Sequence, residues 1–108
     1  MLDALFGCVA AERVLLYLSR FDEGYARGIA QHFGTALTSV QKQLAKFEGA
    51  GVLVSVEKGR TLMYFWNPRY PFLAELRALL AKAYEYLTPE EKERYIVRTR
   101  PRRRGKPA

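Results

Sequence analysis

The sequence predicts a mainly α-helical domain with one small β-hairpin near its middle. Three observations support this fold class. Apolar residues recur at helical spacing in several segments that glycines and prolines separate. Two segments rich in β-formers, 52–56 and 62–66, flank Glu57-Lys58-Gly59-Arg60, which has the composition of a hairpin turn of about four residues. A further helical stretch follows the hairpin, after a connector that contains Pro68 and Pro71. With 108 residues, the chain has room for one core.

The sequence predicts three helices in the first third of the chain. They cover residues 3–6, 10–20 and 26–33. Gly7 ends the first helix, and the acidic turn Asp22-Glu23-Gly24 separates the second from the third. Gly34 suits a helix end because glycine adopts the left-handed conformation without steric cost. Arg27, near the start of the third helix, is a candidate phosphate contact at the positive end of that helix.

A fourth helix, residues 38–50, has the composition of a DNA-recognition helix. Its inner face is apolar, and its opposite face carries small hydroxyls and lysines without a carboxylate: Thr38, Ser39, Lys42, Ala45 and Lys46. Such a helix fits a major groove, with its first residues near base edges and its lysines near phosphates. We expect Thr38, Ser39 and Gln41 to contact bases, and Lys42 and Lys46 to contact the backbone.

The simpler interpretation of this helix is an ordinary solvated face. Lysine pairs are common on exposed helices, and both Gln41 and Gln43 flank the face as surface residues often do. The helix start is also atypical, because Ala36 stands where a capping side chain is usual. Thr35 is therefore the predicted side-chain cap.

The predicted hairpin follows Gly51 and alternates between two faces. Tyr64, Trp66 and Leu62 share the face expected to point inward. Met63 and Phe65 lie on the other face, where a solvated strand would carry polar residues, so a protein partner could cover them. At the hairpin tip, spanning 57–61, Lys58 and Arg60 place positive charge on both sides of Gly59, as contact with a nucleic-acid backbone requires.

After the connector, residues 72–87 predict one long helix. Five apolar residues keep alternating spacings of three and four, as in a helix that packs lengthwise on another helix: Leu73, Leu76, Leu80, Ala83 and Leu87. We expect this stripe, widened by Phe72 and Leu79 and helped by Leu5 and Phe6, to form a homodimer interface. The stripe could instead pack within its own monomer. Thr88, Pro89 and Glu91 then predict a capped final helix that ends near residue 97.

The net charge of +7 belongs mostly to the C-terminus. Residues 98–108 hold six of the 18 basic residues and no acid, so the rest of the chain has 12 basic and 11 acidic residues. We therefore expect a domain over 1–87, a helix over 88–97 and a disordered basic tail over 98–108. The tail is either a solubilising end or an arm that binds nucleic acid.

Several classes of function lack their components in this sequence. No apolar run approaches the roughly 20 residues that span a bilayer, and the short 2–6 patch is no signal peptide. One cysteine and one histidine, Cys8 and His32, cannot form a metal site or a catalytic pair together with the scattered acids. We expect no enzyme activity, no cofactor and no metal, and a reducing cytoplasmic setting, with the protein nucleoid-associated when bound.

The order of helix, helix, turn, helix, hairpin and long helix is that of a winged helix-turn-helix domain with additional C-terminal helices for dimerisation. The segment from Val40 through Gly51, followed by Gly59-Arg60, Tyr64 and Asn67-Pro68, resembles transcriptional regulators of the ArsR-like class. The resemblance implies a homodimer that binds double-stranded DNA, with Thr38–Lys46 in the major groove and the wing at the backbone or minor groove.

The paired cysteines of the metal-sensing members of that class are missing. The sequence thus predicts a sequence-specific transcriptional regulator, a repressor by resemblance. Two alternatives remain open: an adaptor that binds a protein through Met63 and Phe65, and a binder of RNA or other nucleic acid driven by the basic tail.

Overall fold

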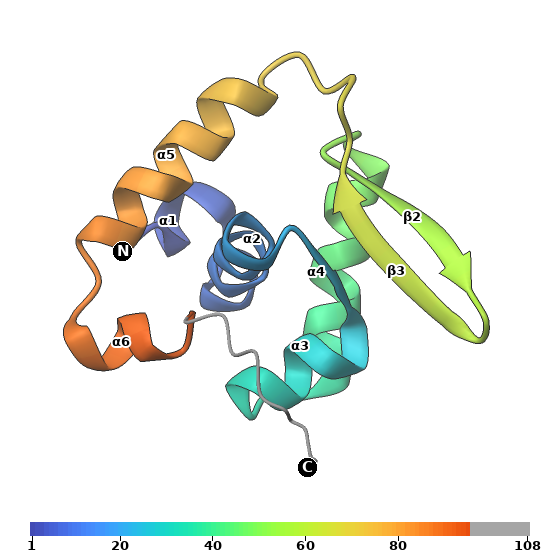
Figure 1. Ribbon diagram of the computed structural model, residues 1–108, viewed down its shortest axis with the longest axis horizontal. Coiled ribbons are helices and arrows are strands. Elements are labelled where there is room, and N and C mark those ends of the chain that lie inside the picture. The colour runs from blue at the N-terminus through green and yellow to red at the C-terminus, as the bar shows by residue number, and fades with distance from the viewer. Residues whose placement is uncertain (96–108) are drawn as a thin grey trace, which may run out of the picture.

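The structure, a computed structural model, describes residues 1–95. Its elements are, in order, α1 (Asp3–Phe6), α2 (Val9–Phe21), β1 (Glu23–Tyr25), α3 (Ala26–Phe33), α4 (Leu37–Gly49), β2 (Leu53–Lys58), β3 (Thr61–Trp66), α5 (Leu73–Glu85) and α6 (Pro89–Glu93). Figure 1 shows α2 near the centre, with α3 and α4 to one side and α5 and α6 to the other. The β2–β3 hairpin projects away from the helices. The predicted basic tail lies outside the described residues.

The predicted helix-turn-helix is present as α3 and α4. Helix α3 has the predicted bounds, and α4 begins one residue before the predicted 38. Gly34 ends α3 in the left-handed conformation, with a φ of 66°. Both helices share one apolar core with α2, in which Leu15, Leu18, Ile29 and Leu44 are among the most deeply buried side chains.

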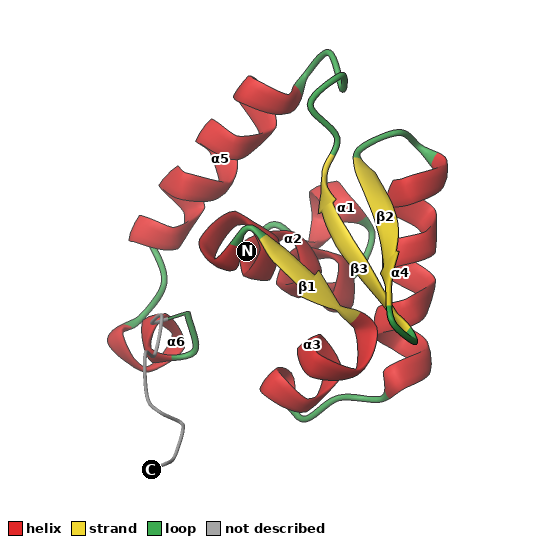
Figure 2. Ribbon diagram, turned by 45° about the vertical axis from the view of Figure 1, so that its right-hand side comes forward, coloured by secondary structure: helices red, strands yellow, loops and turns green. Residues whose placement is uncertain are grey.

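Strand β1 was not predicted; the sequence placed a turn at its first two residues. It pairs antiparallel with β3, so the sheet has three strands in the order β1-β3-β2 (Figure 2). Gly24 makes this pairing possible, because a Cβ on it would lie 2.8 Å from a ring carbon of Tyr17 and 3.1 Å from Ile29. A larger residue there would push the strand off α2 and α3.

The hairpin turn is shorter than the predicted four residues. Lys58 pairs with Thr61, which leaves Gly59 and Arg60 as the two-residue loop. Gly59 has a φ of 64°, and two-residue hairpin loops favour glycine because they require a positive φ. The strand pairing of the hairpin therefore continues to Lys58 and Thr61, directly beside the loop.

Two hydrogen bonds fix the base of the hairpin on the helices. The indole N–H of Trp66 donates to the Leu18 carbonyl of α2 at 3.1 Å. The Asn67 side-chain amide donates to the Gly51 carbonyl, just after α4, at 2.8 Å. Because Trp66 is buried, water does not compete for this hydrogen bond, which fixes the orientation of the hairpin relative to the core.

The two faces of the hairpin differ as predicted, with one exception. Tyr64 and Trp66 are buried at 8% exposure, whereas Leu62 is 45% exposed because it lies beyond the edge of the core, near the tip. On the outer face, Met63 and Phe65 are half-buried beside the cross-strand residues Val56 and Val54.

The final helix, α6, begins as predicted. Thr88 and Glu91 form a complete capping box at the start of α6. In the described chain, however, α6 ends at Glu93 instead of continuing toward residue 97, and Tyr95 is buried in the core just beyond it. No helix among residues 1–95 is long and apolar enough to cross a membrane.

Candidate nucleic-acid interface

Helix α4 presents a polar side to solvent. Val40, Leu44 and Phe47 turn its other side into the core, and all five predicted contacts on this helix are exposed: Thr38, Ser39, Gln41, Lys42 and Lys46. Thr38 lies three residues before Gln41 and four before Lys42, so the three side chains are neighbours on the helix surface. They form one continuous polar patch on this helix.

A groove of about 340 Å³ lies between α3, α4 and the hairpin. Three sequence-predicted contacts line it from three different elements: Arg27 of α3, Gln41 of α4 and Arg60 of the hairpin turn. The described lining also includes Tyr25, Ala26, Leu37, Thr61, Leu62 and Tyr64, and none of these is acidic. Two arginines and one glutamine therefore line a single open groove, a composition suited to a polyanion.

The helix starts beside this groove carry no side-chain caps, so the predicted capping role of Thr35 is wrong. The N-cap of α4 is Ala36, which has no side-chain acceptor, and no side chain bonds to the helix start. Helix α3 begins at the N-cap Tyr25, also without a side-chain hydrogen bond. Uncapped first-turn N–H groups favour a negative charge nearby, and Arg27 adds to this preference.

Five predicted contacts do not line the groove: Thr38 and Lys42, which lie beside Gln41 on the surface of α4, and Ser39, Lys46 and Lys58. The Lys46 ammonium donates to the Phe6 carbonyl at 2.9 Å, which directs it toward α1 rather than toward the outer side of α4. The Lys58 ammonium lies 5.2 Å from the centre of the Phe65 ring, on the outer face of the sheet. Ser39 lines a separate hollow between α2, α3 and α4. Helical spacing had grouped Ser39 and Lys46 with the other contacts of α4, whereas Lys58 had been chosen for its place beside Gly59 at the hairpin tip.

Much of the predicted dimer stripe lies inside the core of the single chain. Leu80 is fully buried, and Ala83 and Leu87 are 5% and 8% exposed. Leu73 and Leu76 are half-buried against the same core. Leu80, Ala83 and Leu87 are therefore core residues and not interface residues, because a partner cannot contact a side chain that its own chain encloses.

A neighbouring stripe on α5 remains exposed. Phe72, Leu79 and Tyr86 follow one another at seven-residue intervals and are 62%, 38% and 70% exposed. Leu5 of α1 is 69% exposed, whereas Phe6 is partly buried against the core. The apolar surface that a partner can contact thus lies on a different face of α5 from the predicted stripe.

Sequence reasoning missed several groove residues. Tyr25 is 40% exposed, and its ring lies over Gly28, where a Cβ would come within 2.8 Å of it. Thr61 and Tyr64 line the groove from β3. Burial raises the pKa of the Tyr64 phenol, and the charge of Glu48 adds to the effect, so this hydroxyl stays neutral at physiological pH. The unrecognised strand β1 concealed the position of Tyr25.

The two residues with metal or redox chemistry lie apart from this interface. Cys8 is half-buried at the N-cap of α2. His32 lies among aromatic rings, 5.2 Å from Tyr17 and 4.8 Å from Phe33 between ring centres. Within residues 1–95 no three His, Cys, Asp or Glu side chains are grouped as a metal site would require.

No family model matches the chain, and no curated protein matches its sequence. Among solved structures, the crystal structure of the AntR antimony-specific transcriptional repressor is similar, with a TM-score of 0.56. The likeness covers 76% of this chain and 68% of the repressor chain at 20% sequence identity. The predicted mainly α-helical fold with a β-hairpin wing is confirmed: the chain shares the winged helix-turn-helix fold of that structure.

Proposed function

We propose that this protein is a sequence-specific, double-stranded DNA-binding regulator that acts as a repressor. Helix α4 enters the major groove, with Thr38 and Gln41 toward the bases and Lys42 toward the backbone. Arg60 at the hairpin tip and Arg27 at the start of α3 contact phosphates on either side. The fold that the chain shares with a repressor supports this class of function, and the sign of regulation is taken from that likeness.

The observation that carries the proposal is the groove shared by Arg27, Gln41 and Arg60. These residues are far apart in the sequence, yet the fold brings them around one opening beside the exposed side of α4. Non-acidic lining with two arginines favours a negatively charged partner, and the phosphate backbone of DNA is one. Neutralised phosphates release counterions, so binding of this kind weakens steeply with salt.

The same proposal includes a homodimer formed through the exposed stripe of α5. Phe72, Leu79 and Tyr86 repeat every seven residues, the spacing that brings side chains of two packed helices together. Leu5 of α1, also exposed, is a further apolar candidate for this interface. A two-fold dimer would place its two α4 helices in successive major grooves and require inverted half-sites about one helical turn, roughly 34 Å, apart.

The test begins with selection of duplexes from random DNA by the full chain at physiological salt. We expect an inverted repeat. Binding of the selected duplex is then measured against salt concentration for Arg60→Gln and Arg27→Gln. Each substitution should lower the log–log slope by about one, because each removes one phosphate contact. Gln41→Ala should keep the slope and relax the preference at one base position.

Arg69→Gln is the matched control, since Arg69 is an exposed arginine in the connector after β3 and does not line the groove. Its slope and base preference should equal those of the parent. Selection that yields no motif, together with slopes that Arg60→Gln and Arg27→Gln leave unchanged, would refute the proposal.

A second candidate is the predicted adaptor, favoured by the outer face of the sheet. Met63, Phe65, Val54 and Val56 form an apolar surface there, and Val56 is 49% exposed. An adaptor would bind a protein through this face and would show no motif in the DNA selection. Met63→Lys would abolish such binding while leaving DNA affinity unchanged.

The basic tail enters the proposal as an accessory arm. Tyr95, where the described chain ends, is 4% exposed, and its carbonyl accepts a hydrogen bond from Arg20 Nε at 2.7 Å. Its ring also packs 5.8 Å from that of Phe33 at the end of α3. The described chain thus ends beside the end of α3. Truncation after residue 97 should weaken binding and reduce its salt dependence but keep the selected motif; loss of all binding would favour the tail-driven alternative.

A further inference from the structure

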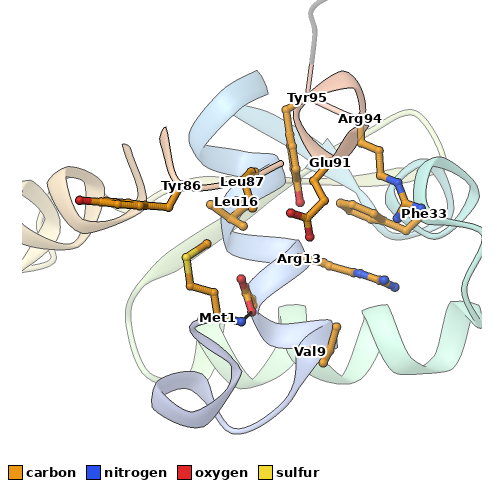
Figure 3. Close-up of a pocket in the computed structure, with 11 residues that line it drawn as sticks. Met1, Val9, Arg13, Leu16, Phe33, Tyr86, Leu87, Glu91, Arg94 and Tyr95 are labelled. Atoms are coloured by element: carbon orange, nitrogen blue, oxygen red, sulfur yellow. Dashed lines mark hydrogen bonds and ion pairs between the residues drawn. The ribbon is translucent and has the colours of Figure 1, made fainter. Parts of the chain in front are cut away.

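A second opening lies on the far side of α2 from the hairpin. It is a pocket of about 250 Å³ between α2, the end of α3 and the C-terminal helices. One face of α2 forms its floor through Val9, Glu12, Arg13 and Leu16. Its walls are Met1, Phe33, Tyr86, Leu87, Glu91, Arg94 and Tyr95 (Figure 3). None of the sequence-predicted DNA contacts lines it.

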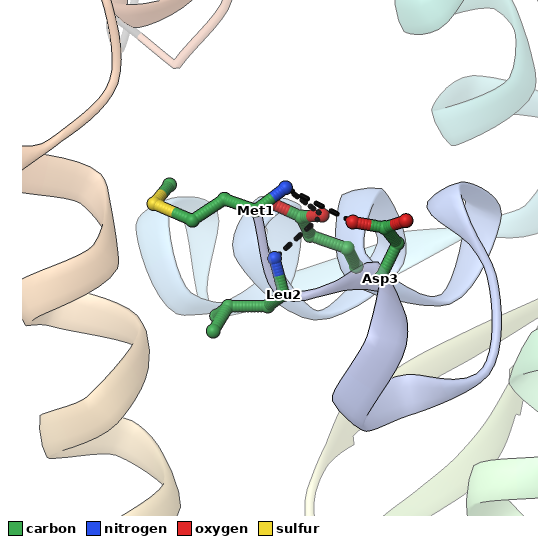
Figure 4. A network of polar contacts seen from close by, with 4 residues as sticks. Met1, Leu2 and Asp3 are labelled. Atoms are coloured by element: carbon green, nitrogen blue, oxygen red, sulfur yellow. Dashed lines mark hydrogen bonds and ion pairs between the residues drawn. The ribbon is translucent and has the colours of Figure 1, made fainter.

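The two acids of this pocket already have partners within the protein. Glu12 Oε1 accepts hydrogen bonds from the backbone N–H of Leu2 at 3.1 Å and from the Met1 amine at 3.4 Å (Figure 4). Glu91 Oε1 accepts from the Thr88 backbone N–H at 2.8 Å as part of the capping box. That hydrogen bond lowers the pKa of Glu91, so its carboxylate stays ionised in this role.

The two arginines have no such close partners, although the charge of Arg94 contributes to the lowered pKa of Glu91. Within residues 1–95, neither Arg13 nor Arg94 forms an ion pair with a carboxylate. The Arg13 guanidinium instead lies 5.4 Å from the centre of the Phe33 ring. Figure 3 shows Arg13 and Arg94 reaching toward the same side of the pocket, beside Phe33, and the Tyr95 ring standing above the centre. Positive charge and aromatic surface are thus adjacent and available.

We propose that this pocket binds a small organic carboxylate with an aromatic or similarly compact apolar body. The carboxylate pairs with the guanidinium groups of Arg13 and Arg94, for which planar bidentate acceptors are the best partners. The apolar body packs on Phe33, Tyr95 and Leu16. The volume is below the roughly 300–1,000 Å³ of pockets for drug-sized ligands, which favours a single ring. The nearby acids disfavour a multiply charged anion such as a nucleotide.

The pocket also adjoins the recognition helix through a shared wall. Val9, Arg13 and Phe33 line both this pocket and the smaller hollow of about 120 Å³ beneath α4, which Ser39 and Val40 complete. A carboxylate that draws Arg13 away from the Phe33 ring changes the wall on which the start of α4 rests. Binding in the pocket therefore alters DNA affinity; this consequence, unlike the binding itself, rests on the proposed function.

The test uses the full chain and benzoate as the probe, with benzyl alcohol as the uncharged analogue. Titration is followed through the ring signals of Phe33 and Tyr95 in NMR spectra. We expect a saturable shift with benzoate, with a Kd on the order of 1 mM for a ligand of this size, and none with benzyl alcohol. Arg13→Gln should weaken benzoate binding about tenfold or more.

Arg94→Gln provides a second variant, because Arg94 is exposed and its loss leaves the core unchanged. Arg69→Gln, which also removes an exposed arginine but lies outside the pocket, should bind benzoate as the parent does. Absence of saturation overturns the site. So does equal binding of benzyl alcohol, or benzoate affinity that both pocket variants retain.

Repeating the DNA titration with saturating benzoate tests the coupling separately. The parent should change its DNA affinity, and Arg13→Gln should not. Benzoate binding with unchanged DNA affinity keeps the site and overturns the coupling. Benzoate binding by a protein that selects no DNA motif keeps the site and overturns the proposed function instead.

Discussion

Replacing Gln43 by Met should make the protein more stable. The Gln43 side chain is 7% exposed on the core-facing side of α4, and its Oε1 has no hydrogen-bond partner among residues 1–95. A buried acceptor without a partner costs about 1–3 kcal/mol. Methionine has a similar length and volume and no strong polar group, so Gln43→Met removes that cost and leaves neither a cavity nor a clash.

The expected gain lies at the lower end of this range, about 1 kcal/mol, because the side chain keeps a small exposed fraction. For a domain of this size, that gain corresponds to a rise in Tm of roughly 4–8 °C. In urea, the midpoint should increase while the slope m stays the same, since the surface exposed on unfolding hardly changes. Both transitions can be followed by circular dichroism without DNA.

Gln41→Met is the matched control: the same substitution, two residues earlier on the same helix, on the exposed side. It should change the free energy of unfolding by no more than about 0.5 kcal/mol. A Gln43→Met variant no more stable than the parent would show that the amide oxygen has a partner in solution and would refute the reasoning. An equal gain in both variants would assign the effect to helix propensity.

Five further substitutions test the C-terminal part of the described chain. Leu80→Ala should lower the free energy of unfolding by about 2–5 kcal/mol, since the side chain is fully buried. Phe72→Ala and Tyr86→Ala should instead weaken self-association, measured by sedimentation equilibrium. Unchanged self-association would place the interface elsewhere. Burial raises the pKa of the Tyr95 phenol, so the folded chain holds this proton more tightly than the unfolded chain. The contribution of this phenol to the free energy of unfolding is complete below the unfolded pKa of about 10 and is lost as the pH rises above that value. Tyr95→Phe should reduce that loss by about 1.4 kcal/mol per pH unit in urea titrations above pH 10. Thr88→Ala should cost about 1 kcal/mol through the lost cap, seen as faster amide exchange in α6.

Elements with a long local pattern were predictable from the sequence. Helix α3 was predicted at its observed bounds and α4 within one residue, because apolar spacing and the following glycines define them. Strand β1 was not, since three residues carry too little periodicity and its pairing with β3 is formed only in the folded chain. The requirement for Gly24 likewise becomes visible only once Tyr17 and Ile29 are in place.

The candidate interface was predictable as a set of residue types but not as a surface. Arg27, Gln41 and Arg60 were each proposed on local grounds, and the structure brings them to one groove. Lys46 and Ser39 satisfied the same helical-wheel criterion yet lie toward α1 and α2. A wheel gives angular position only, and residues at the edges of an exposed face can turn toward either neighbour. The elements beside α4 therefore decide toward which side an exposed edge residue turns.

The stripe on α5 shows why a heptad-like spacing alone does not identify an interface. Any helix that lies along a core needs an apolar face of this period, and the Leu80 position meets that need inside the monomer. A dimer surface has to be sought in apolar residues that exceed the face used by the core. Phe72 and Tyr86 are such residues, because they are more than half exposed and repeat with Leu79 at seven-residue intervals. Apolar side chains that stay exposed because the monomer core does not use them are thus the observation that supports self-association of this chain.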